Sequence, residues 1–218
     1  MKTVKADLNG DSKPESISIS DIRPSGDFVL HINDLTVKGD LKSIGVPADG
    51  FVVVDIDTSD RYQEVGVHTP GPSDDDAYLF YWYDGSAIHE MKARLGRWPK
   101  FPGNGIVYVD SWMGFWKITD KYVLTKKRNL RLVPQQFHYV GETGMVHKSI
   151  PLYERPASSN IVANLKVNSP IVVVLADLSG NPEEAQDIWY LIKTETNLLG
   201  WTKGHVFPDS ISAGTSAD

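Results

Sequence analysis

The chain has 218 residues, of which 41% are hydrophobic and 23% charged, as in an ordinary globular protein with a buried core. It has no cysteine, which excludes disulfides, thiolate metal sites and cysteine nucleophiles. The net charge of −6 is uneven: residues 1–90 carry 17 acidic and 7 basic side chains, and residues 91–218 carry 11 and 15. This asymmetry favours two modules with different partners. The acidic half argues against nucleic acid, which requires clustered Lys and Arg.

The expected compartment is the exterior of the cell. No apolar run reaches the roughly 18 residues that span a bilayer, so no membrane span is predicted. No signal peptide is visible either. Because a strand and an acidic loop follow Met1 almost at once, we expect the native protein to begin upstream with an export signal. The lack of cysteine fits an exported protein of the bacterial surface.

Strand signals dominate the first 140 residues. Period-two or β-branched runs are separated by Gly, Pro, Asp and Asn, and the best helical pattern is a single turn at Asp40–Ile44. The densest basic run, Lys117–Arg131, alternates with apolar residues and indicates solvated strand faces rather than a site for an anionic polymer. Strands are predicted at Glu15–Ser20, Phe28–Ile32, Phe51–Asp55, Glu64–His68, Tyr78–Tyr83, Gly105–Val109 and Lys121–Thr125.

These strands form a repeat. Asp7 and Asp55 stand 48 residues apart, each after an apolar strand and before an acidic loop, which is the spacing of a four-stranded propeller blade. A third copy begins near Gly105 without an acidic loop and continues through apolar runs at Phe115–Ile118, Tyr122–Thr125 and Asn129–Val133. The pattern predicts an all-β fold, with a propeller-like array of about three four-stranded antiparallel sheets over residues 1–140. A propeller usually has at least about four blades.

The first acidic loop, Asp7–Glu15, has the donor pattern of a calcium site. Calcium takes six to eight oxygen ligands, and a tight loop with alternating oxygen-bearing side chains delivers them to one point. The side chains of Asp7, Asn9 and Asp11, the carbonyl of Lys13 and the closing Glu15 are the predicted ligands. The alternative is a solvated Asp-Gly turn.

The second acidic loop is one residue longer. Asp55, Asp57 and Asp60 are its predicted ligands, with Glu64 in the closing position. Arg61 offers an alternative, because its guanidinium would pair with a carboxylate in place of a metal.

Both loops, with the apolar strands that follow them, resemble the calcium loops of FG-GAP and VCBS repeats in integrin-type propellers. The aromatic strand that ends in the Asp-Gly turn of Tyr81–Ser86 is similar to the same family. The resemblance implies a propeller-like domain that binds calcium.

The C-terminal segment resembles the bacterial SH3-like domain of cell-wall proteins. The resemblance rests on Pro151-Leu152-Tyr153, the Pro156–Ser159 turn, Ile161–Leu165, Trp189–Ile192 and Gly200-Trp201, and it departs at Asn197–Leu199 and at an insertion over Leu178–Asp187. It implies a small barrel over residues 141–210, followed by a disordered tail at 211–218.

Such domains often recognise peptidoglycan peptides, so the resemblance implies a cell-wall ligand. Tyr153, Trp189, Tyr190 and Trp201 would then form an aromatic groove. The alternative is that at least two of these rings belong to the core.

No enzyme signature is present: His89-Glu90 lacks the second histidine of a zinc motif, and no Gly-x-Ser-x-Gly elbow occurs. We therefore expect a non-catalytic, calcium-binding surface module that binds cell-wall peptidoglycan or a surface protein. Paired carboxylates leave no sequence signature, because their separation is spatial. The alternative is thus a cell-wall hydrolase, or its accessory targeting fragment, that uses carboxylate catalysis.

Overall fold

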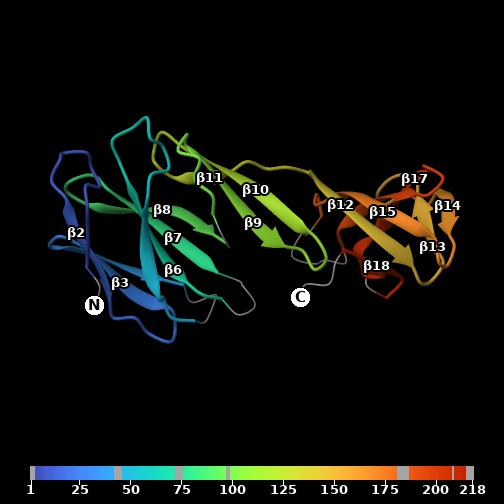
Figure 1. Ribbon diagram of the computed structural model, residues 1–218, viewed down its shortest axis with the longest axis horizontal. Helices are drawn as coiled ribbons and strands as arrows, with labels where there is room; N and C mark the ends of the chain where they lie inside the picture. The colour runs from blue at the N-terminus through green and yellow to red at the C-terminus, as the bar shows by residue number, and fades with distance from the viewer. Residues whose placement is uncertain are drawn as a thin grey trace. The chain divides into compact units, whose positions relative to one another are not determined.

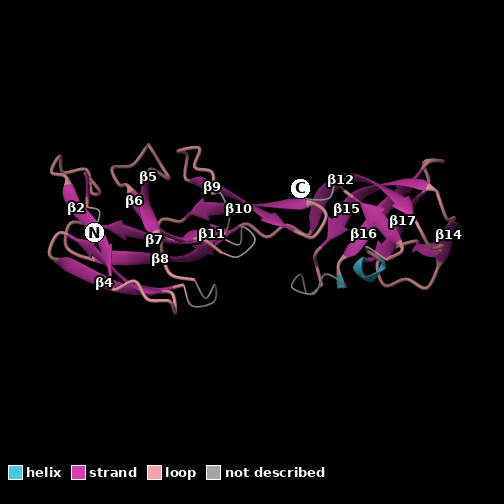
Figure 2. Cartoon of the chain, turned by 60° about the horizontal axis from the view of Figure 1, so that its bottom comes forward, coloured by secondary structure: helices cyan, strands magenta, loops and turns pink. Residues whose placement is uncertain are grey.

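A computed structural model of the chain describes residues 3–41, 46–71, 76–96, 99–180, 187–207 and 209–214. The described part is all-β, as predicted, with one 3-10 turn η3 (Gly204–Val206) after the seventeenth strand (Figure 2). Most of the single helical turn predicted at Asp40–Ile44 lies outside the described residues. Among the described residues, no helix has the length and apolar character needed to cross a membrane.

The chain divides into two units, which are described separately. The N-terminal unit comprises Met1–Ser111 and Thr119–Val133, and the C-terminal unit comprises Trp112–Ile118 and Pro134–Asp218. The C-terminal unit is therefore discontinuous in sequence, whereas the sequence pattern predicted one boundary at residue 140.

Two sheets of the N-terminal unit are four-stranded antiparallel meanders in chain order (Figure 1). The β2 sequence Glu-Ser-Ile-Ser-Ile-Ser alternates buried and half-buried residues, because successive side chains of a strand face opposite sides. The first sheet contains β1 (Val4–Ala6), β2 (Glu15–Ser20), β3 (Asp27–Ile32) and β4 (Leu35–Asp40), and the second contains β5 (Gly50–Val54), β6 (Glu64–Thr69), β7 (Ala77–Tyr83) and β8 (Ile88–Leu95).

The third sheet has three strands in the order β11-β10-β9. They are β9 (Ile106–Trp112), β10 (Lys117–Leu124) and β11 (Leu130–Leu132). The prediction of four strands here is wrong, because the apolar runs at 115–118 and 122–125 fall largely in the single strand β10.

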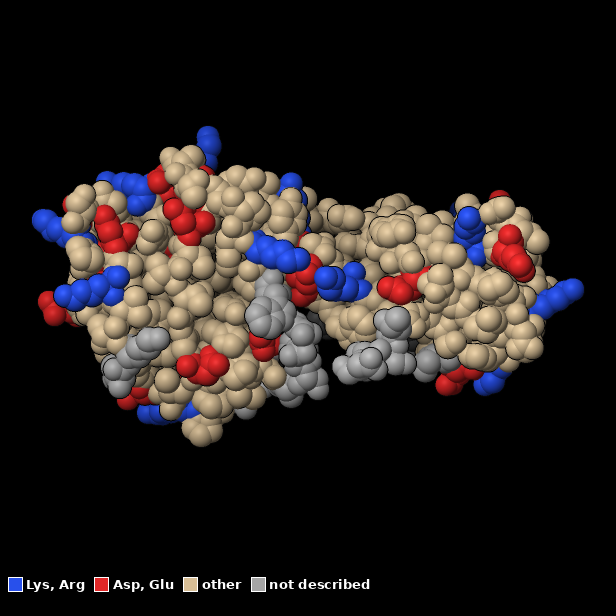
Figure 3. All heavy atoms as spheres, viewed as in Figure 1, with Lys and Arg blue, Asp and Glu red and all other residues tan. Residues whose placement is uncertain are grey.

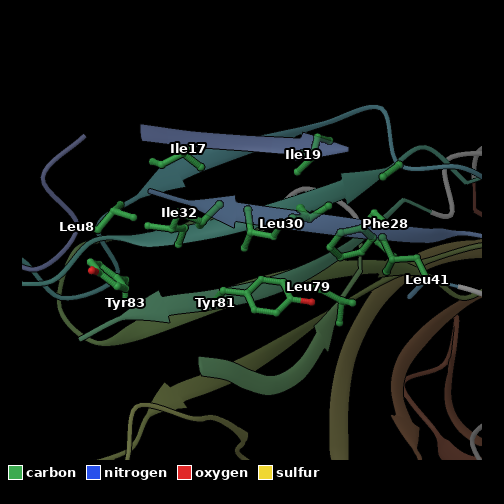
Figure 4. Close-up of a cluster of buried hydrophobic side chains, with 14 residues drawn as sticks. Leu8, Ile17, Ile19, Phe28, Leu30, Ile32, Leu41, Leu79, Tyr81 and Tyr83 are labelled. Atoms are coloured by element: carbon green, nitrogen blue, oxygen red, sulfur yellow. The ribbon is translucent and has the colours of Figure 1, made fainter. Parts of the chain in front are cut away.

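The N-terminal core is formed by alternating apolar residues of facing strands. Figure 4 shows side chains of β2 and β3, among them Ile17 and Leu30, gathered with Tyr81 and Tyr83 of β7. A second cluster contains Phe80, Met91 and Val107. Burying one such side chain fully contributes about 1.5–3 kcal/mol. These clusters hold the strands from which the acidic loops project.

Two strand glycines provide a test of this packing. A Cβ on Gly66 of β6 would lie 2.5 Å from the Phe80 ring, whereas one on Gly50 of β5 would meet nothing within 4 Å. Overpacking a core costs about 1–3 kcal/mol, so Gly66→Ala should lower the free energy of unfolding by that amount. Gly50→Ala should change it by less than about 0.5 kcal/mol. Urea unfolding measures both, and equal losses would contradict the packing described.

The C-terminal unit contains one seven-stranded antiparallel sheet, a half-barrel, in the order β14-β13-β17-β16-β15-β12-β18. Strand β12 begins at residue 137 and carries a bulge between Tyr139 and Glu142. The strands are β12 (Phe137–Val146), β13 (Ile150–Tyr153), β14 (Ile161–Leu165), β15 (Pro170–Asp177), β16 (Trp189–Thr194), β17 (Leu199–Lys203) and β18 (Ile211–Ala213).

Trp116 and Tyr190 are central to the core of this unit. Trp116 is 1% exposed and its indole N–H donates to the Tyr190 hydroxyl at 3.3 Å. Ile211 of β18 is fully buried in the same cluster, and β18 pairs with β12. The prediction of a disordered tail from residue 211 is therefore wrong for 211–213, and residues 215–218 lie outside the described part.

Charge does not follow the division into units. The N-terminal unit contains 19 acidic and 16 basic residues, because the acidic residues 1–90 and most of the basic stretch 91–133 fold together. On the face shown in Figure 3, acidic and basic side chains are interspersed. The uneven charge of the sequence thus allows ion pairing within one unit instead of marking two modules.

Candidate functional site

The first acidic loop, between β1 and β2, is folded around the carboxylate of Asp7. One oxygen of Asp7 accepts the backbone N–H groups of Gly10 at 2.8 Å and Asp11 at 3.2 Å, and the other accepts that of Ser12 at 2.8 Å. Gly10 has φ +71°, a conformation that favours glycine. The sequence folds tightly here because short acidic side chains bond to the backbone that follows them.

The other predicted ligands of this loop lie on the same turn. The Asn9 side-chain oxygen accepts the Asp11 N–H at 3.0 Å, and a carboxylate oxygen of Asp11 accepts the Lys13 N–H at 2.8 Å. A carboxylate has about four lone-pair sites, so Asp7 and Asp11 keep acceptor capacity beyond these bonds. The donor set of this loop therefore fits a hard cation such as calcium.

Glu15, the predicted closing ligand, lies beneath the loop. Its carboxylate accepts the Leu8 N–H at 2.7 Å, and the residue is only 4% exposed. This contact joins the start of β2 to the start of the loop.

The second acidic loop, between β5 and β6, has the same internal plan. The Asp57 carboxylate accepts the Ser59 N–H at 3.1 Å and hydroxyl at 2.6 Å, and these bonds lower the pKa of Asp57. Glu64 accepts the Ile56 N–H at 3.1 Å, as Glu15 accepts that of Leu8.

Each loop also bonds to the segment of the following sheet. The Leu8 carbonyl accepts the N–H of Gln63 at 3.1 Å, and the Ile56 carbonyl accepts that of Gly105 at 2.8 Å. Leu8 and Ile56 are both fully buried. The 48-residue repeat seen in the sequence thus has an atomic counterpart, in which one buried residue anchors its own glutamate and the next loop.

The loops differ in one respect: a basic side chain enters the second. Arg128, from the turn between β10 and β11, donates to Asp60 at 2.5 Å and to Glu64. Its guanidinium lies 4.4 Å from the ring centre of Tyr62 and 5.4 Å from that of Trp82. The Arg128 side chain is 11% exposed, so the second loop contains a largely desolvated cation.

Burial controls the protonation of this cluster. It raises the pKa of Glu64 to about 7, against the opposing effects of the Ile56 N–H and Arg128. Burial and then the negative charge of Asp60 raise the pKa of Asp55. One carboxylate oxygen of Asp55 is buried without a hydrogen-bond partner in the described part of the chain. The cluster therefore has more negative charge than its surroundings stabilise easily, and Arg128 offsets it.

Arg61, the cation that the sequence suggested, has a different position. It donates to the Tyr62 hydroxyl at 2.9 Å and lies over that ring, and the residue is exposed. The expectation that Arg61 replaces a metal is thus wrong in its residue. Arg128 makes those contacts, and its 64-residue separation from Glu64 leaves no local signal of it.

The C-terminal unit contains a groove of about 680 Å³. Two of the four predicted aromatic residues line it: Tyr153 and Trp189, whose ring centres are 6.1 Å apart in an edge-to-face arrangement. Polar and basic residues complete the lining, namely Lys148, Ser158, Ser159, Thr202, Lys203, His205, Asp209 and Ser210. Neither the basic residues nor the serines of the groove were predicted.

Lys203 links the aromatic and charged parts of the groove. Its ammonium lies 5.7 Å from the Trp189 ring centre and 3.5 Å from the carboxylate of Asp187. Lys148 and His205 add basic groups to the lining, which also contains Asp209. The groove can therefore contact an apolar or sugar face and a charged group of one ligand.

The other two predicted rings lie elsewhere. Tyr190 is 2% exposed in the core, and burial raises its pKa. Trp201 is paired with Tyr153 across β13 and β17, but it contacts Phe137 at 6.3 Å and does not line the groove. The structure thus brings together two of the four residues.

No protein-family model matches the chain, and neither a curated protein nor a solved structure matches it. The fold and the candidate sites define its class directly. It is an all-β protein of two units, with two acidic loops in one and an aromatic, partly basic groove in the other.

Proposed function

We propose that the chain is a non-catalytic surface module whose C-terminal unit binds cell-wall peptidoglycan or a surface protein in the groove at Tyr153 and Trp189. The observation that carries this proposal is the groove itself, where two aromatic rings lie beside Lys203. Pockets that bind ligands combine such rings with a few polar groups that fix orientation. Peptidoglycan matches this lining, because its sugars present apolar faces and its peptides carry carboxylates.

Removing the Trp189 ring should abolish most of this binding. Central aromatic residues of an interface typically contribute 2 kcal/mol or more, so Trp189→Ala should weaken binding by roughly 30-fold. Co-sedimentation with purified peptidoglycan measures this. Trp112→Ala is the matched control, because Trp112 is 51% exposed and does not line the groove.

Three results would contradict the assignment. They are failure of the unmodified chain to co-sediment with peptidoglycan or a surface protein, equal loss in both variants, or full binding by Trp189→Ala. Clearing of a cell-wall suspension by the purified chain would instead support the hydrolase alternative.

The charge cluster at Glu64 does not support that alternative. A carboxyl group with a pKa near neutrality is typical of a general acid. Glu64 has a pKa of about 7, but it is fully buried and bonded to Arg128 and to the Ile56 N–H. A substrate cannot reach it without unfolding the loop.

The proposal includes one calcium ion at the first acidic loop. Asp7, Asn9 and Asp11 would hold it with their side chains, together with the carbonyl of Lys13. Bound calcium would supply positive charge to a loop whose carboxylates otherwise repel one another. Support comes from the donor set and from the exposure of Asp11 at the surface.

Calcium should therefore stabilise the protein. A ligand at 100 times its Kd adds about 2.7 kcal/mol to the free energy of unfolding, and this raises Tm. Melting curves with calcium and with a chelator measure the shift, and Asp11→Ala should remove it. Asp34→Ala in the exposed β3–β4 turn should leave it unchanged. An identical Tm in both conditions would reject the calcium site.

We also propose finer descriptions of the fold. Two four-stranded meanders with equivalent closing glutamates support propeller-type blades of the FG-GAP and VCBS kind. The half-barrel sheet with its groove supports an SH3-like barrel. Both are consistent with an exported protein, and detection of the native protein in a cell-wall fraction would test that location.

A further inference from the structure

The turn that carries Arg128 is built to hold this side chain in place. The Thr125 N–H donates to the Asn129 carbonyl at 2.9 Å, and the Arg128 N–H donates to the Thr125 carbonyl at 2.8 Å. The Thr125 hydroxyl also accepts the Asn129 N–H at 3.1 Å. Arg128 itself has φ +55°, which is unfavourable for a residue with a side chain. Three hydrogen bonds therefore stabilise a strained backbone that delivers one guanidinium to the second acidic loop.

The surroundings of Arg128 select a cation. Its two terminal nitrogens bond to Asp60 and Glu64, and the charges of Asp55 and Asp57 also act on it. The faces of Tyr62 and Trp82 cover it, and aromatic faces attract cations. A planar guanidinium satisfies two carboxylates at once, which a single ammonium does less well.

We propose that Arg128 is the permanent cation of the loop Asp55–Glu64, and that this loop binds no calcium while Arg128 is present. A metal ion there would have to displace the guanidinium from Asp60 and Glu64 and leave it desolvated and unpaired, which is costly. The predicted ligand set of this loop therefore does not fit calcium.

The first loop lacks this arrangement. Within the described residues, Asp7 and Asp11 have backbone hydrogen bonds and no recorded ion pair. The inference concerns the second loop alone, so it stands whether or not the first loop binds calcium.

The test is a calorimetric calcium titration in a background where the first loop is neutralised by Asp7→Asn and Asp11→Asn. With Arg128 present, we expect no binding at millimolar calcium. Arg128→Gln removes the charge but keeps an amide donor, and it should then bind one calcium at least 100-fold more tightly than the parent. Arg128→Lys keeps the charge and should stay without calcium. With the first loop intact, Arg128→Gln should bind one ion more than the unmodified chain.

Two results would overturn the inference. One is calcium binding by the Arg128-containing parent that Asp55→Asn removes. The other is an Arg128→Gln variant that binds calcium no more tightly than the parent. If Arg128→Gln unfolds in chelator, recovery of its circular dichroism on adding calcium supports the inference, and failure to recover overturns it.

Discussion

Replacing Arg128 with alanine should lower the free energy of unfolding of the N-terminal unit by about 3–5 kcal/mol. The reason is that Glu64, which is 0% exposed, then loses the guanidinium that offsets its charge. Removing one partner of a buried ion pair costs more than the pair itself contributes, because the remaining charge stays desolvated. Urea unfolding followed by tryptophan fluorescence measures the loss.

A double-mutant cycle with Glu64→Gln isolates this effect. If the uncompensated charge causes the loss, adding Arg128→Ala to Glu64→Gln should cost clearly less than adding it to the unmodified chain, with a coupling of about 0.5–3 kcal/mol. Additive losses would show that Arg128 stabilises the unit by packing on Tyr62 and Trp82 instead.

The loss should also depend on pH. The pKa of Glu64 rises from 4.5 to about 7 on folding, so its protonated form favours the folded state. Its contribution to stability is full below pH 4.5 and declines as the pH rises through 7. Without Arg128, which lowers this pKa, the decline extends to higher pH. The difference between Arg128→Ala and the unmodified chain should therefore increase above pH 7.

The largest effect in the C-terminal unit should come from Trp116→Ala. Trp116 is 1% exposed, and its ring packs against Tyr190 with centres 6.5 Å apart in an edge-to-face arrangement. Truncating a buried tryptophan to alanine costs about 3–5 kcal/mol through lost contacts and the cavity that remains. The indole N–H that donates to the Tyr190 hydroxyl is lost as well. Chemical unfolding of the full chain should show the C-terminal unit melting at a markedly lower denaturant concentration.

Two variants separate the causes of that loss. Trp112→Ala removes a tryptophan that is 51% exposed and should change stability by less than about 0.5 kcal/mol. Trp116→Phe keeps a ring but removes the hydrogen bond and part of the volume, so its cost should lie between the other two. A Trp116→Ala loss no larger than that of Trp112→Ala would mean that this residue is not central to the core.

Most of the β-strands could be predicted because each strand carries its own signal. The alternation of Ser and Ile in Glu15–Ser20 gives both the strand and its buried face. Errors arose where two apolar runs shared one strand, as in Lys117–Leu124, and where a short strand depends on a distant partner. Ile211–Ala213 pairs with β12, more than 60 residues away, and nothing in its own sequence indicates this.

The candidate sites were predictable only in part, for the same reason. The acidic loops are local, so Asp7, Asp11 and Glu15 stand out, although the hydrogen bond from the Leu8 N–H to Glu15 does not. Arg128 lies in a basic run that indicated solvated strand faces, and its carboxylate partners belong to another sheet. Tyr190 looks like its neighbour Trp189 in the sequence, but alternation along β16 turns one ring inward and the other toward the groove.

The discontinuity of the C-terminal unit determines how the protein can be dissected. A fragment that begins at residue 141 starts in the middle of β12 and lacks Trp116 and Ile118, so its core has a hole larger than any single truncation would leave. Failure of such a fragment to bind would report an incomplete core, not the absence of a ligand. Any transplant of this unit into another chain must therefore include Trp112–Ile118, and ligand screens should use the full chain.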